Sequence, residues 1–125
     1  MDKFQAAFEV LYFLASVDGY VDKREVDVIF DFLNANFGKI NFDPKKVVDV
    51  ISSMTSEGMV DELEHAALIF KNSSSAQDRM TLLDFALALV AADGKIKDQE
   101  RDLFFILGNT WNIDLERYFK SKGLS

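Results

Sequence analysis

Two short acidic strings occur at a fixed spacing along the chain. Each has an Asp-Gly pair, an aliphatic residue two places later and a Glu four places after that: Asp18, Gly19, Val21 and Glu25, then Asp93, Gly94, Ile96 and Glu100. Carboxylate oxygens are the ligands that hard cations such as Ca²⁺, Mg²⁺ and Mn²⁺ prefer. The carboxylates of Asp18, Glu25, Asp93 and Glu100 would therefore form one divalent-cation site if the two strings met in space.

Neither string makes a complete cation site by itself. Each matches the second half of an EF-hand loop, which also needs oxygen ligands four and two residues before the Asp. Those positions hold Leu14 and Ser16 in the first string, and Leu89 and Ala91 in the second. Leucine cannot bind calcium, so an EF-hand is excluded and any cation must be shared between the strings. Zinc is disfavoured as well, because the chain has no cysteine and one histidine.

A structural role explains the same residues. Asp before Gly is common where a helix ends, and a Glu in the first turn of the next helix satisfies free backbone amides. In this alternative the strings only cap helices, and the chain acts as a protein–protein interaction module through an apolar or acidic face. Phe13, Phe32 and Phe105 lie off the main apolar stripes and could form such a face, although burial between helices is the better expectation.

The helices that must position these strings follow from apolar spacing and capping residues. The pattern predicts no strands and about seven helices, at residues 2–17, between Asp22 and Gly38, from Pro44, at 56–71, at 76–92, at 98–111, and from Asp114 to Gly123. Residues 72–75 should be a loop. The segment 76–92 is the most apolar and should be the central helix. We therefore expect a single domain over residues 1–125, a compact all-α bundle built from two pseudo-repeated helix–DG turn–helix halves.

Composition and charge narrow the class of function. The net charge is −7 over 125 residues, which disfavours binding to nucleic acid or to anionic lipid. No segment approaches the roughly 20 apolar residues that span a bilayer. Asp2 and Glu9 fall within the first helical pattern, which is unlike a signal peptide, so a cytoplasmic location is expected.

No sequence feature indicates an enzyme. His65 is the one histidine and has no evident catalytic partner, and the chain contains no phosphate-binding glycine motif. We expect a non-enzymatic protein with a divalent metal ion as its only cofactor and another protein as its partner. Its oligomeric state is not indicated.

The two strings, with the apolar runs that precede them, resemble the twin motifs of the TerB-like tellurite-resistance family, which includes the N-terminal domain of a DnaJ-like co-chaperone. The resemblance implies a seven-helix bundle and a metal-binding role for the carboxylates of Asp18, Glu25, Asp93 and Glu100. It also implies a part in the bacterial response to tellurite and other chemical stress. One difference separates the two motifs, because Lys97 stands where the first has Asp22. Nothing resembles a J-domain, so a co-chaperone role does not follow.

Overall fold

The computed structural model describes residues 1–17, 21–39, 41–91 and 94–124. These residues form seven α-helices and no strand, as the sequence predicts. The helices are α1 (Lys3–Ser16), α2 (Lys23–Phe37), α3 (Pro44–Ser52), α4 (Ser56–Ser73), α5 (Ala76–Val90), α6 (Asp98–Trp111) and α7 (Leu115–Ser121). Within the described part of the chain, no helix is both long and apolar enough to cross a membrane.

Side-chain caps explain where most of these helices begin. In six of them the residue before the first turn accepts a hydrogen bond from a backbone N–H two or three residues later; the six are Asp2, Asp22, Asp43, Thr55, Ser75 and Asp114. Such caps satisfy amides that have no partner within the helix. At the other end of α2, Gly38 has a φ of 101°, which suits glycine.

The expected loop at 72–75 is shorter than predicted, because α4 continues to Ser73. The hydroxyl of Ser73 donates to the carbonyl of Ile69, and that of Ser74 donates to the carbonyl of Phe70. Serines bonded to the preceding turn are compatible with a helix. The cap predicted at Ser75 is present, since Ser75 and Asp78 exchange side-chain and backbone hydrogen bonds.

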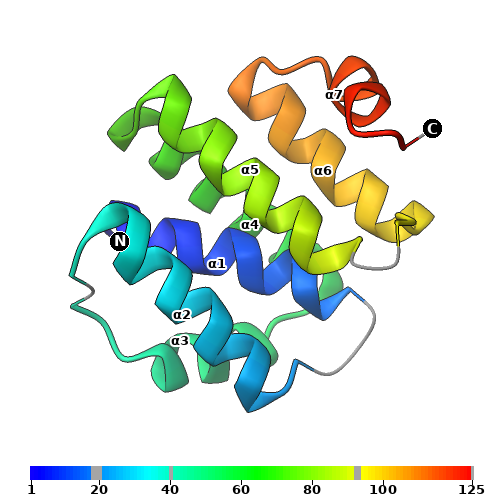
Figure 1. The fold of residues 1–125 in the computed structure, drawn as a ribbon. Coiled ribbons are helices and arrows are strands. Elements are labelled where there is room, and N and C mark those ends of the chain that lie inside the picture. The colour runs from blue at the N-terminus through cyan, green and yellow to red at the C-terminus, as the bar shows by residue number, and fades with distance from the viewer. Residues whose placement is uncertain (18–20, 40, 92–93, 125) are drawn as a thin grey trace.

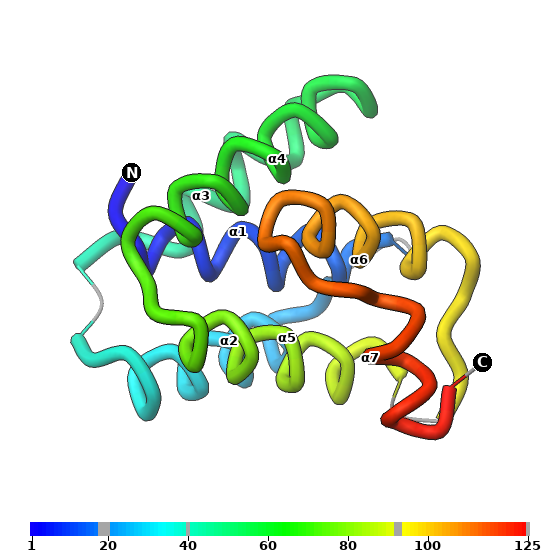
Figure 2. Tube along the Cα trace, turned by 90° about the horizontal axis from the view of Figure 1, so that it is seen from above, coloured from blue at the N-terminus to red at the C-terminus, as the bar shows by residue number. Residues whose placement is uncertain are grey.

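The helices are arranged in three layers (Figure 2). α3 and α4 form one outer layer, α1 and α6 the middle layer, and α2 and α5 the other outer layer, with α7 beside α6 (Figure 1). α1 packs against α4 on one side and against α2 and α5 on the other. The Trp111 indole on α6 donates to the carbonyl of Ala67 on α4 at 2.8 Å and ties these layers together.

The central helix is α1, so the prediction that 76–92 would be central is wrong. Nine consecutive residues of α1, from Ala6 to Leu14, are buried, whereas α5 leaves Asp84 and Ala88 exposed. An element that packs against helices on both sides buries its whole circumference, including any polar residue on it. Glu9 lies in this buried stretch and is only 2% exposed.

Aromatic rings fill spaces between the helices. Phe13 is buried, and Phe32 and Phe105 are half-buried against the core, so the expectation of burial is confirmed over that of an exposed aromatic patch. Phe32 stacks on Phe85 of α5 with the ring centroids 3.8 Å apart. Phe105 meets Phe119 edge-on at 6.3 Å.

Candidate functional site

The first motif joins α1 to α2. Asp18 and Gly19 lie outside the described residues, and the description resumes at Val21, whose side chain is buried. Asp22 caps α2, since its Oδ1 accepts from the backbone N–H of Glu25 at 2.9 Å. Glu25 itself is half-buried in the first turn of α2.

The second motif joins α5 to α6. Its helix is capped by the motif glutamate, whereas the residue before the helix caps α2 in the first motif. Asp93 lies outside the described residues, and Gly94 follows with a φ of 81°. Lys97 precedes α6 and has no carboxylate to offer. Here the side chain of Glu100 caps the helix, because its Oε1 accepts from the backbone N–H of Lys97 at 3.0 Å. Glu100 is 2% exposed, so the glutamate of the second motif lies much deeper than that of the first.

The helix ends that flank both motifs lie at one end of the bundle. The carboxyl ends of α1 and α5 and the amino ends of α2 and α6 point to the same side in both views (Figures 1 and 2). No group of three or more metal-binding side chains occurs among the described residues, a set that excludes Asp18 and Asp93. Of the four predicted ligands, the structure therefore places Glu25 and Glu100 only.

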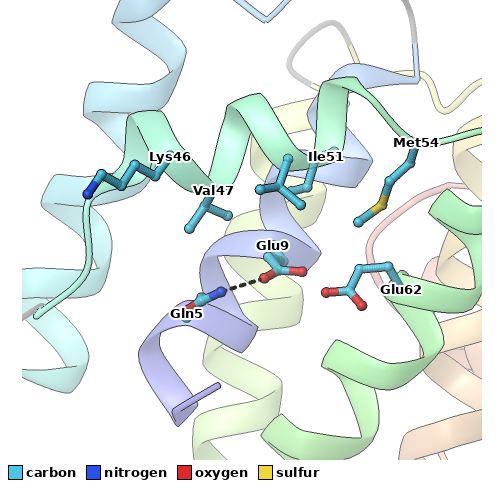
Figure 3. Close-up of a pocket in the computed structure, with 8 residues that line it drawn as sticks. Gln5, Glu9, Lys46, Val47, Ile51, Met54 and Glu62 are labelled. Atoms are coloured by element: carbon cyan, nitrogen blue, oxygen red, sulfur yellow. Dashed lines mark hydrogen bonds between the residues drawn. The ribbon is translucent and has the colours of Figure 1, made fainter.

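A second acidic feature was not predicted from the sequence. Glu9 of α1 and Glu62 of α4 direct their carboxylates toward one another across a pocket that α3 covers (Figure 3). Burial raises the pKa of Glu9 to about 8, and the neighbouring Glu62 carboxyl acts in the same direction. The Gln5 amide opposes this shift by donating from Nε2 to Glu9 Oε2 at 3.0 Å. Sequence periodicity assigns a lone glutamate to the solvent face, and only the packing around α1 reveals its burial.

His65 lies on the exposed side of α4. Its side chain is 59% exposed on α4, and Nδ1 lies 3.4 Å from Glu62 Oε1. This single contact to a carboxylate of its own helix supplies no nucleophile.

The fold and the paired motifs define the class: an all-α bundle whose DG motifs each stand between two consecutive helices. The chain belongs to the family described as tellurite resistance protein TerB, whose family model matches residues 4–116. This match confirms the resemblance read from the two motifs. No curated protein and no solved structure matches the chain.

Proposed function

We propose that the chain binds a hard divalent cation between its two DG motifs, through Asp18, Glu25, Asp93 and Glu100. The observation that carries this proposal is the position of the four helix ends that flank the motifs, all at one end of the bundle (Figures 1 and 2). Two acidic motifs at the same end can share an ion, whereas motifs at opposite ends could not.

The chemistry of the four side chains favours Ca²⁺, Mg²⁺ or Mn²⁺, since all are oxygen ligands and water would complete the coordination shell. Asp18 and Asp93 lie outside the described residues, so their part in binding the cation is tested by substituting them. Membership of the TerB family supports a non-enzymatic part in the cytoplasmic response of bacteria to tellurite and other chemical stress. We expect the acidic chain to bind the cation rather than tellurite, because tellurite is an oxyanion.

Thermal unfolding of chelator-treated protein, with and without each cation at about 1 mM, tests this proposal. A ligand that binds only the folded state raises its stability, by about 2.7 kcal/mol at one hundred times Kd. We expect at least one of the three cations to raise Tm, and the D18N/D93N variant to show a smaller rise than the wild type. A D31N/E116Q variant removes two exposed carboxylates elsewhere, on α2 and α7, and should respond like the wild type. A Tm that no cation changes contradicts the proposal.

One observation favours a second candidate function. Glu100 is buried and bonded to the backbone of its own helix, as a purely structural cap would be. If both motifs serve only the fold, the chain acts as a protein–protein interaction module. In that case D18N and E25Q should lower the unfolding free energy by about 1 kcal/mol, the size of a capping contribution, equally with and without metal.

A further inference from the structure

Glu9 contains a buried oxygen for which the described residues provide no partner. Its Oε2 accepts from Gln5, but its Oε1 is out of contact with solvent and forms no hydrogen bond there. A carboxylate oxygen buried without a donor is costly, so such an atom in a folded protein calls for an explanation. A shared proton or a bound cation is the physical means of satisfying it.

Glu9 also lines a cavity that contains a second carboxylate. The cavity has a volume of about 200 Å³ and lies between α1, α3 and α4, with Gln5, Glu9 and Glu62 on one side and Val47, Ile51 and Met54 among its apolar walls. Glu9 and Glu62 come from different helices, and Figure 3 shows their carboxylates facing each other. When one of two facing carboxylates is buried, both cannot ionise without a compensating positive charge.

None of the described cations near the pair forms a salt bridge with Glu9. Lys46 of α3 lines the cavity, but its ammonium is directed away from both carboxylates (Figure 3). His65 contacts Glu62 while its own ring is largely exposed, and no salt bridge joins any described cation to Glu9. The amino group of Met1 lowers the pKa of Glu9 by its charge, yet burial dominates and the net shift is upward.

From this geometry we infer that Glu9 and Glu62 form a cation site of their own, separate from the DG motifs, which takes a hard divalent cation such as Mn²⁺, Mg²⁺ or Ca²⁺. The two carboxylates offer oxygen ligands of the kind these ions bind, and Gln5 orients Glu9 by donating to its Oε2. A cavity of about 200 Å³ has room for the ion and several waters, at about 30 Å³ each. It is smaller than the roughly 300 to 1,000 Å³ of sites for organic ligands, so a metal ion fits it better than an organic amine.

Binding at this site releases a proton. Below a pH of about 8 the buried carboxyl of Glu9 is protonated, and the metal must displace that proton to bind the carboxylate. The apparent affinity should therefore rise about tenfold per pH unit up to a pH of about 8 and then level off. Glu62 lies nearer the solvent and keeps the pair open to ions in solution.

Equilibrium dialysis with Mn²⁺ at a pH of about 8, followed by metal analysis, tests the inference in five variants, one of which carries E9Q as its single substitution. The D18N/D93N variant should keep one Mn²⁺ per chain, and E9Q added to it should remove that ion. E62Q in place of E9Q should weaken binding at least tenfold, which keeps the test valid if a change at the buried position disturbs folding. E64Q, at an exposed glutamate of the same helix, should leave binding unchanged.

The outcomes separate this site from the one proposed for the motifs. If the variant with E9Q as its single substitution binds Mn²⁺ and D18N/D93N does not, the inference is overturned and the motif site stands. The reverse pattern supports the Glu9–Glu62 site and overturns the motif site. If the D18N/D93N variant binds no Mn²⁺, the facing carboxyls share only a proton and the inference is wrong.

Discussion

Glu100 Oε1 accepts a hydrogen bond from the backbone N–H of Lys97 at 3.0 Å, so the glutamate of the second motif caps the start of its own helix. In the first motif the helix is capped by the residue that precedes it, because Asp22 Oδ1 accepts a hydrogen bond from the backbone N–H of Glu25. The Asp-to-Lys difference between the motifs is thus compensated by a deeper glutamate. The two motif glutamates, though equivalent in sequence, differ in burial and in structural role.

This difference predicts unequal costs of substitution. E100A should lower the free energy of unfolding by about 1–3 kcal/mol, because it removes both a cap and a buried side chain. E25A should cost less, since Glu25 is half-buried and the side chain of Asp22 caps that helix. Urea unfolding followed by Trp111 fluorescence measures both. Q99A, at an exposed neighbour, is the control, and equal losses in E100A and Q99A would contradict the assignment.

Gly108 of α6 lies against the Leu115 side chain of α7. A Cβ at this position would lie 2.5 Å from Cδ2 and 2.7 Å from Cγ of Leu115, which is far inside van der Waals contact. G108A should therefore destabilise the chain by about 1–3 kcal/mol, despite the better helix propensity of alanine. N109A changes an exposed residue of the same helix and should have little effect.

A double variant locates the cause of that loss. In G108A/L115A the clash is removed, so the combined loss should be smaller than the sum of the two single losses. Strict additivity in chemical denaturation would show that the contact with Leu115 is not responsible.

Trp111 offers a test of the junction between α6 and α4. W111F removes the indole N–H that donates to the carbonyl of Ala67 and reduces the volume of a side chain that is 4% exposed. We expect a loss of about 1–3 kcal/mol, from the missing hydrogen bond and the space left behind. Thermal unfolding by circular dichroism measures it, since the variant lacks the tryptophan signal. An unchanged Tm would mean that this hydrogen bond contributes nothing to stability.

Most of the fold could be predicted because its signals are local. Asp22, Asp43 and Ser75 mark helix starts through hydrogen bonds that span two or three residues, and the structure contains each of them. The packing order could not be predicted in this way. α1 is at least as apolar as α5, so apolar content does not single out 76–92. Which helix is enclosed on both sides depends on contacts between distant segments.

Of the two candidate sites, one is visible in the local sequence and the other arises only from the packing of distant segments. The motif carboxylates are visible in the sequence because an Asp-Gly turn repeats, but the repeat alone does not say how far apart the ligands lie. Glu9 has no sequence signal at all, since Gln5 and Glu9 one turn apart are typical of a solvated helix face. Only the helices packed around α1 turn that face into the wall of a cavity.

The burial of Glu9 predicts a pH dependence of stability with a definite sign. Its pKa is about 8 in the folded chain and near 4.5 when exposed, so over that interval the folded state holds more protons than the unfolded state. The contribution is therefore fully present below a pH of about 4.5 and is lost as the pH rises towards 8. The slope approaches about 1.4 kcal/mol per pH unit within the interval.

E9Q isolates this contribution, because glutamine has nearly the same shape and does not ionise. In chelator-treated samples, the unfolding free energy of E9Q minus that of the wild type should increase from a pH of about 5 to about 8. Above that range the difference should be constant, since Glu9 is then ionised in both states. E64Q provides the matched control, since Glu64 is an exposed glutamate of α4, and its difference from the wild type should stay nearly flat. A flat difference for E9Q as well would mean that the carboxyl of Glu9 titrates normally, and that the cavity is wetter and more polar than its apolar walls indicate.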